Sequence, residues 1–195
     1  MSNSRVMIFI DGSNLFWAAR ARNIPIDYQK LIDFLANFKG SRSLVRPYYY
    51  GAEKVPPDSA QRGFYEKLRF QGIEVVTKPL VKRISWATLL TNNARVQVTK
   101  EEEKGVDVAM VTDMLSMAYK NAYDAAISVG ADADFENAIQ NIKQIPKRVE
   151  IAAFSDDDTT NVPPKYFCTA CRKMRMLPDL FIPLEKYVDK FRRTI

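Results

Sequence analysis

Short uninterrupted apolar runs alternate along the chain with segments whose apolar residues recur at helical spacing. The first run, Val6–Ile10, ends at Asp11-Gly12, and a run of this length is typical of a strand buried on both faces of a parallel sheet. Strand and helix then alternate, which indicates an α/β fold with right-handed crossovers. The elements predicted in the first half are helix 28–38, strand 43–51, helix 59–70 and strand 73–77.

The second half continues this alternation. Strand 123–130 is rich in small apolar residues, so we expect it at the centre of the sheet. Pro47 lies within strand 43–51 and cannot donate to a sheet ladder, so that strand is expected at an edge or with a bulge. The other elements predicted here are helix 106–119, a helix from Phe135 that stops at Pro146, strand 149–154, a helix around 165–176, strand 180–182 and a tail helix over 184–193.

One stretch departs from the alternation. Residues 84–90 and 94–99 flank Thr91-Asn92-Asn93, a pattern that predicts a β-hairpin with an Asn-containing turn. We therefore expect an inserted β-ribbon at about 80–100. The predicted organisation is a single domain over 1–195, with a core at about 5–155 and a C-terminal helical extension at about 164–195.

Composition narrows the function classes. The apolar runs are far shorter than the roughly 18 residues of a membrane span, and the N-terminus lacks a signal-peptide pattern, so we expect a cytoplasmic protein that does not contact a membrane. The formal charge of +6 favours polyanionic partners such as nucleic acid. The chain has no His, which excludes Ser/His and Cys/His triads and His-ligated zinc. Catalysis would have to use carboxylates, lysine, hydroxyls or a hard metal ion.

Four aspartates occupy corresponding ends of the predicted elements. Asp11 follows the first strand, Asp132 and Asp134 follow strand 123–130, and Asp107 opens helix 106–119. The C-terminal ends of parallel strands lie on one edge, and right-handed crossovers make these two strands neighbours, so we expect the four acids to converge. Each also has a structural interpretation, since Asp11 alone would be read as a helix cap and Asp107 as a charge favoured by the helix dipole.

Such a cluster of carboxylates repels itself and persists only with a cation or shared protons. Ligands that are all oxygen suit Mg²⁺ or Mn²⁺, and the chemistry that fits is metal-assisted attack of water on a phosphodiester. Asn14 could orient a ligand or a metal-bound water, and Lys104 could contact phosphate. A helix is expected to begin near Leu15, capped by Ser13 or Asn14.

Three motifs in series resemble the NYN domain family, also called LabA-like, of the PIN-like nuclease superfamily. They cover roughly residues 5 to 155 in matching order and spacing, and they are Ile10-Asp11-Gly12-Ser13-Asn14, Lys104-Gly105-Val106-Asp107-Val108 with Asp113, and Asp132-Ala133-Asp134-Phe135.

The resemblance implies a Rossmann-like three-layer α/β/α sandwich with a mainly parallel sheet, and a Mg²⁺-dependent ribonuclease site. It implies that Asp11, Asp107, Asp132 and Asp134 are metal-binding acids and that Asn14 is the associated polar residue. Many family members have Ser-Gly before the first acid of the last motif, whereas this chain has Gly130-Ala131. Two alternatives stay open: a catalytically weak or inactive RNA-binding or regulatory module, and a phosphatase acting on nucleotides.

The predicted ribbon carries basic and aromatic residues suited to a single-stranded backbone and a stacked base, namely Lys82, Arg83 and Arg95 with Trp86. A solvated ribbon or a homodimer contact explains them equally well. The lone pair Cys168 and Cys171 cannot complete a four-ligand zinc site and is interpreted as ordinary thiols. Asp156–Asp158 are interpreted as a solvated capping loop, and a late basic block that includes Arg172 and Arg193 as a supporting hint of RNA contact.

Overall fold

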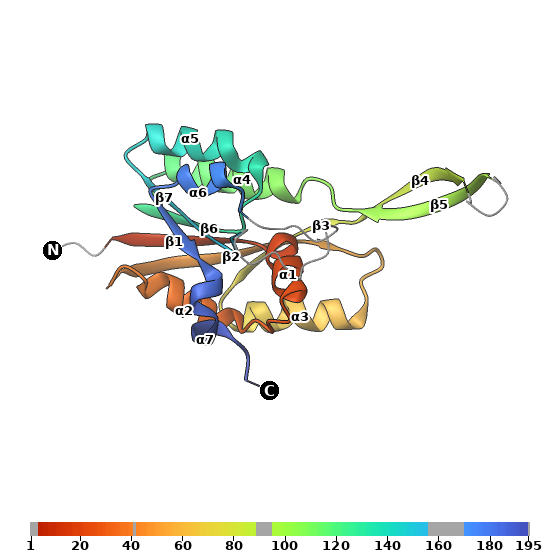
Figure 1. Ribbon diagram of the computed structural model, residues 1–195, viewed down its shortest axis with the longest axis horizontal. Coiled ribbons are helices and arrows are strands. Elements are labelled where there is room, and N and C mark those ends of the chain that lie inside the picture. The colour runs from red at the N-terminus through yellow and green to blue at the C-terminus, as the bar shows by residue number, and fades with distance from the viewer. Residues whose placement is uncertain (1–3, 41, 89–94, 156–169, 195) are drawn as a thin grey trace.

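A computed structural model describes residues 4–40, 42–88, 95–155 and 170–194 (Figure 1). Its centre is a six-stranded sheet in the order β3-β2-β1-β6-β7-β8, in which every neighbouring pair is parallel. In chain order its strands are β1 (Arg5–Asp11), β2 (Ser43–Glu53), β3 (Glu74–Pro79), β6 (Ala125–Val129), β7 (Arg148–Ala153) and β8 (Leu180–Pro183).

Helices cover both faces of the sheet and complete the predicted α/β/α sandwich (Figure 1). One layer contains α1 (Gly12–Ala21), α2 (Tyr28–Asn37), α3 (Ser59–Phe70), the 3₁₀ turn η4 (Leu184–Tyr187) and α7 (Val188–Phe191). The other contains α4 (Val106–Tyr119), the 3₁₀ turn η1 (Ala133–Phe135), α5 (Glu136–Gln144) and α6 (Arg172–Met176).

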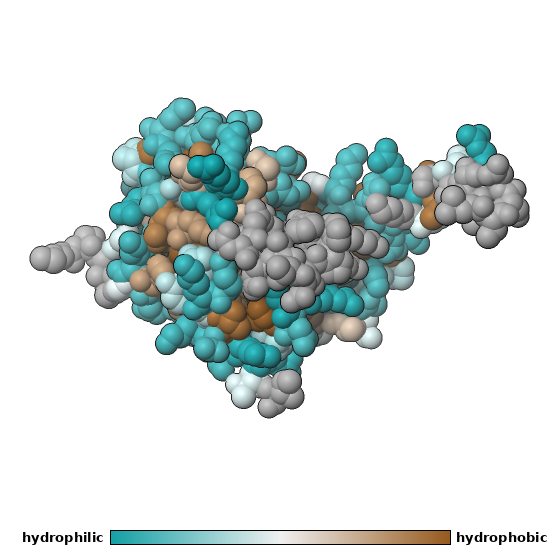
Figure 2. Space-filling model, viewed as in Figure 1, coloured by the Kyte–Doolittle hydropathy of each residue, from teal (hydrophilic) through white to brown (hydrophobic). Residues whose placement is uncertain are grey.

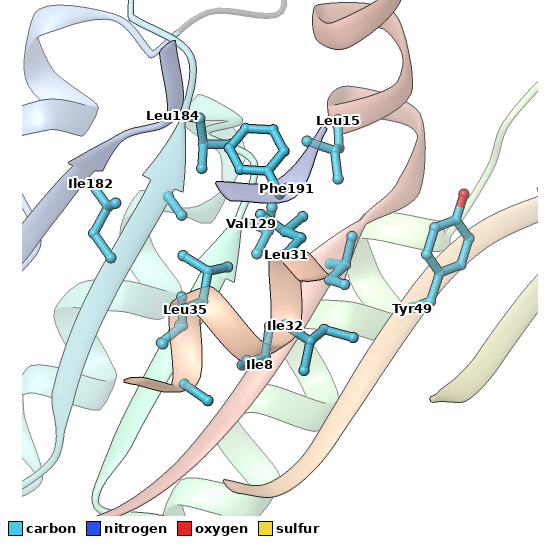
Figure 3. Close-up of a cluster of buried hydrophobic side chains, with 14 of the residues drawn as sticks. Ile8, Leu15, Leu31, Ile32, Leu35, Tyr49, Val129, Ile182, Leu184 and Phe191 are labelled. Carbon is cyan, nitrogen blue, oxygen red and sulfur yellow. The ribbon is translucent and has the colours of Figure 1, made fainter. Parts of the chain in front are cut away.

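Both faces of β1 are buried, which is why its residues form an unbroken apolar run. Val6, Ile8 and Ile10 point into the cluster under α1, α2 and α7, whereas Met7 and Phe9 point into the cluster under α4 and α5. Alternate side chains of a strand face opposite sides, so both faces of β1 are buried as predicted. Figure 3 shows the first of these clusters, in which residues from strands and helices far apart in sequence meet.

The order of the strands reverses between β1 and β6. The chain proceeds from β1 outward through β2 to β3, and later from β6 outward through β7 to β8. The predicted neighbours β1 and β6 pair directly, from Val6↔Ala125 to Ile10↔Val129. This reversal is the point at which open α/β sheets bind ligands, at the C-terminal ends of the strands.

The structure decides between the two alternatives for Pro47. β2 lies inside the sheet between β1 and β3, so Pro47 does not mark an edge, and the alternative, a bulge, is confirmed. The register shifts between Val6 and Met7, whose partners are Leu44 and Arg46, and Pro47 then aligns with Ile8. The sheet also extends beyond the expected core, because β8 pairs in parallel with β7.

The C-terminal tail returns to the first helical layer. Instead of one helix over 184–193, it forms η4 and the short α7, and Leu184 and Phe191 pack beside Leu15 and Leu31 (Figure 3). The predictions for Asp156–Asp158, Cys168 and the first five residues of helix 165–176 lie outside the described residues, and the last five residues of that predicted helix form α6. Cys171 is an exposed free thiol directly before α6.

The inserted ribbon is confirmed as a separate antiparallel pair of strands, β4 (Val81–Thr88) and β5 (Arg95–Glu102). It projects from the body of the molecule (Figure 1), and its predicted turn lies outside the described residues. Hydrophilic residues cover most of the face seen in Figure 2, with apolar residues in separate patches. No helix in the described ranges has the length and apolar character needed to cross a bilayer.

A candidate carboxylate site at the edge of the sheet

Asp11 ends β1 at the point where the strand order reverses. Its side chain is only 4% exposed, and its Oδ1 accepts a hydrogen bond from the backbone N–H of Asn14 at 2.9 Å. The helix therefore begins at Gly12 with Asp11 as its N-cap. The expectation of a cap from Ser13 or Asn14 is wrong, because the turn already places the Asp11 carboxylate over the first free N–H groups.

The surroundings of Asp11 oppose its ionisation. Burial is the main cause that raises its pKa to about 7, and the hydrogen bond from Asn14 only partly offsets it. The negative charges of Asp107, Asp132 and Glu103 raise it further. The pKa of Asp11 is thus raised by three acids that are distant in sequence. This is expected for side chains gathered at one edge of the sheet.

Asp107 and Asp132 approach this edge from the other helical layer. Asp107 lies in the first turn of α4, and its pKa is raised by desolvation and by the charges of Asp132 and Asp134. Asp132 follows β6 and accepts a hydrogen bond through Oδ1 from the backbone N–H of Asp134 at 3.0 Å, capping η1. The electrostatic coupling thus links all four predicted aspartates.

Gly130 explains how closely the two acid-bearing strands approach each other. Its φ is +120°, and a Cβ built at this position would lie 3.0 Å from the Cβ of Asp11 and 3.4 Å from the Cβ and Oδ1 of Asn14. A side chain here would be strained and crowded. The end of β6 therefore packs directly on Asp11 and Asn14, two residues before Asp132.

Glu103 is a site residue that the sequence analysis missed. Desolvation is the main cause that raises the pKa of Glu103, the charge of Asp107 raises it further, and the Ser13 hydroxyl partly offsets both. In the sequence, Glu103 ends an acidic run, Glu101–Glu103, that seemed only to lead into the next helix. Its position four residues before Asp107 is the one signal that could have indicated a role at the same edge.

The donor chemistry of this cluster fits a hard divalent cation, which prefers carboxylate oxygens and, as Mg²⁺, retains several waters. However, no three acids in the described part of the chain are close enough together to form a direct metal-binding group. Asp113, which belongs to the second motif, makes a different contact from the four aspartates of the candidate site. The hydroxyl of Tyr50 donates to its Oδ2 at 2.9 Å, so Asp113 ties α4 to β2.

The predicted nucleic-acid residues divide between two places. Lys104 is exposed in the link between β5 and α4, next to Glu103. On the ribbon, Trp86 aligns with Gln97 and Lys82 with Glu101, so Lys82, Trp86 and Arg95 share one face. Those three residues are exposed.

Arg83 lies on the opposite face of the ribbon. Its Nη1 is 3.3 Å from a carboxylate oxygen of Glu102. Contact of the ribbon with RNA, or with a second copy of the chain, stays a prediction.

The parallel sheet, the two helical layers and the acids at the strand reversal define a PIN-like α/β/α protein. A family model described as NYN domain matches residues 5–177, so this chain belongs to the NYN domain family, as its motifs predicted. NYN domains are nuclease-related members of the PIN-like superfamily, whose nucleases typically use divalent metal ions.

One curated protein and one solved structure are similar to this chain over nearly its whole length. The low amplitude and bright protein LabA of Synechococcus elongatus is 28% identical over 193 residues, which cover 97% of this chain and 90% of LabA. The crystal structure of a protein of unknown function from Vibrio parahaemolyticus superposes with a TM-score of 0.66 at 21% identity, covering 98% of this chain and 97% of that one. The second likeness concerns the fold alone.

Proposed function

We propose that this protein is a metal-dependent ribonuclease that hydrolyses RNA phosphodiester bonds, with Mg²⁺ or Mn²⁺ held among Asp11, Asp107, Asp132 and Asp134. The observation that carries the proposal is the buried Asp11, whose pKa is raised to about 7 by burial and by neighbouring acids. A buried carboxylate that lies near other acids destabilises a fold unless a cation or a proton compensates it. A bound divalent cation provides that compensation.

Each residue has a distinct task in this proposal. Asp11 and Asp132 project from neighbouring strands and are fixed by backbone hydrogen bonds from Asn14 and Asp134, at 2.9 Å and 3.0 Å. These bonds are accepted by Oδ1 in each case, and they fix the carboxylate so that Oδ2 can bind a ligand. The ion, when bound, polarises the phosphate and lowers the pKa of an attacking water.

Asn14 and Lys104 complete the proposed site. The amide of Asn14 lies against the end of β6 at Gly130, where it would orient a phosphate oxygen or a water. Lys104 is exposed beside the acids and would attract the RNA backbone by charge, an interaction that weakens as salt is added.

The test is cleavage of a panel of RNAs and DNAs by the purified chain, with Mg²⁺, Mn²⁺ or EDTA. We expect metal-dependent cleavage of RNA by the wild type and its loss in Asp132→Asn. Asp189→Asn is the matched control, since Asp189 is an exposed acid on α7 in the tail, and it should cleave like the wild type. Undiminished cleavage by Asp132→Asn would reject the proposal.

A second candidate is an RNA-binding or regulatory module of the same fold without efficient catalysis. The observation that favours it is Gly130-Ala131, where many family members have Ser-Gly, because no hydroxyl is present beside Asp11 and Asn14 at this point. Such a module would bind RNA and be stabilised by Mn²⁺ but leave RNA intact. Turnover of mononucleotides without RNA cleavage would instead indicate a nucleotide phosphatase.

A further inference from the structure

A cavity of about 810 Å³ opens beside the carboxylate cluster, between α1, α2, α3 and β2. This volume is in the range of ligand pockets, about 300–1,000 Å³. Aromatic side chains contribute much of its wall: Phe16, Trp17, Tyr28, Tyr49, Phe64 and Tyr65. Several of these rings already pack edge to face, with centroids 5.6 Å apart for Tyr28 and Tyr49 and for Tyr49 and Phe64.

The wall of the cavity is fixed before any ligand binds. The Tyr65 hydroxyl and the Gln61 side-chain amide both donate to the backbone carbonyl of Ala52 at 2.8 Å, which ties α3 to β2. A Cβ at Gly51 would lie 3.0 Å from the Tyr65 hydroxyl, so glycine is needed where the ring crosses the strand. Preformed aromatic surfaces lose little entropy on binding a flat ligand.

The cavity and the carboxylate cluster share a boundary. Gly12, Ser13 and Glu103 line the cavity; Gly12 directly follows Asp11 in the chain, and Glu103 is coupled to Asp107. A Cβ on Gly12 would overlap the Tyr49 ring. A ligand part seated against Tyr49 would therefore lie beside the acids, and a covalently attached neighbouring part would extend over them.

Charged and aromatic side chains meet in the lining of the cavity. The charged residues are Arg20, Lys54, Arg193, Asp58 and Glu103, and Lys54 pairs with Asp58 at 3.0 Å. The Arg20 guanidinium lies 5.8 Å from the Phe16 ring centroid and 5.4 Å from that of Trp17. Phe16 is 46% exposed although it is a large apolar residue. Aromatic faces beside cations are the surface on which unpaired bases stack while their phosphates meet positive charge.

We propose that this cavity binds an unpaired base of single-stranded RNA and thereby holds the adjoining phosphate over the carboxylate cluster. This proposal rests on the proposed function, because it names the class of RNA that the site would accept. A base within a duplex is paired and stacked on both sides, so it cannot enter a walled cavity without being unpaired first. Double-stranded RNA would therefore bind more weakly than a single strand of the same sequence.

The experiment measures binding without chemistry. A short fluorescein-labelled single-stranded RNA, and the duplex of the same sequence, are titrated with the full chain in EDTA and followed by fluorescence anisotropy. We expect the single strand to bind more tightly, and Phe16→Ala to weaken its binding by about fivefold or more, since one lost base stack has at least that effect. Phe70→Ala is the matched control, because Phe70 is 91% exposed at the end of α3 and lies outside the cavity lining.

A second variant fills the cavity instead of removing a ring. Ala60 is exposed at the start of α3 and lines the cavity, so Ala60→Trp should block the base while leaving the core intact. Wild-type affinity in both Phe16→Ala and Ala60→Trp would overturn the proposal, as would equal affinity for single strand and duplex. A free nucleoside monophosphate that competes as strongly as the strand would assign the cavity to mononucleotides and overturn the single-strand assignment.

The base-binding proposal and the ribonuclease proposal can be rejected independently of each other. If the wild type does not cleave RNA in Mn²⁺ but Phe16→Ala and Ala60→Trp lose single-strand binding, the pocket stands and the ribonuclease proposal falls. If the wild type cleaves RNA but both variants bind and cleave as it does, the ribonuclease proposal stands and the pocket falls.

Discussion

Replacing Asp11 by Asn tests whether the buried carboxylate of Asp11 destabilises the fold. Asparagine has nearly the same shape and is an equally good N-cap, so its side-chain oxygen can still accept the hydrogen bond from Asn14. It cannot ionise. In the absence of metal, the exchange therefore removes the charge of the buried carboxylate while keeping the local geometry.

The size and sign of the effect follow from the pKa of Asp11, which is about 7 in the fold against an ordinary value of 3.8. Because the folded pKa is raised, stability is greatest below about pH 4 and is lost as the pH rises through 7. At 1.36 kcal/mol per unit, the raised pKa of Asp11 costs the fold about 2 kcal/mol at pH 5, where the carboxyl is ionised only in the unfolded chain, and about 4 kcal/mol at pH 8. Asp11→Asn should recover most of this cost.

The assay is urea denaturation of wild type and Asp11→Asn in EDTA at pH 5 and pH 8. We expect the variant to be more stable, and by about 2 kcal/mol more at pH 8 than at pH 5. The control is Asp124→Asn, because hydrogen bonds from Arg5 lower the pKa of Asp124 to about 2. That variant should lose stability at pH 8. An Asp11→Asn variant no more stable than wild type at pH 8, or with the same difference at both pH values, would refute the reasoning.

Three further predictions follow from the same structure. Mn²⁺ should raise the melting temperature of the wild type more at pH 8 than at pH 6, since Asp11 must lose its proton to bind a cation; equal shifts would contradict this. Gly130→Ser should cost about 1–3 kcal/mol in thermal unfolding because of its positive φ and the nearby Asp11 Cβ, and an unchanged midpoint would show that the backbone can adapt. Glu150→Gln breaks a buried ion pair with Arg42 at 3.0 Å and should cost about 3–5 kcal/mol in urea denaturation. The exposed Glu74→Gln should cost about 1 kcal/mol or less, and similar losses in these two variants would contradict the role given to burial.

The elements with strong local signals were predictable from the sequence. The apolar run of β1 and the helical spacing of α3 and α4 gave these elements close to their observed bounds, because their burial depends on residues within one segment. The pairing of β1 with β6 followed from the handedness of crossovers. Pro47 left an edge and a bulge as alternatives, and only the register, with a bulge two residues earlier, shows that the strand lies inside the sheet.

The parts of the site that escaped prediction depend on contacts between distant segments. Glu103 belongs to the site because its charge is coupled to those of Asp11 and Asp107, and in the acidic run only its spacing from Asp107 could have indicated this. The aromatic cavity likewise joins α1, α2, α3 and β2, and the sequence analysis did not predict it. A local sequence pattern does not indicate which side chains from separate helices and strands contact one another.

The ribbon and the candidate site are connected by a very short tether. β5 ends at Glu102, α4 begins at Val106, and the intervening Gly105 has a φ of +80°. Glu103 lies inside this tether, and Asp107 is the second residue beyond it. The other link of the ribbon to the body is Leu80, between β3 and β4. A load applied at the ribbon is therefore transmitted through two short links, and one of them sets the spacing of two of the acids.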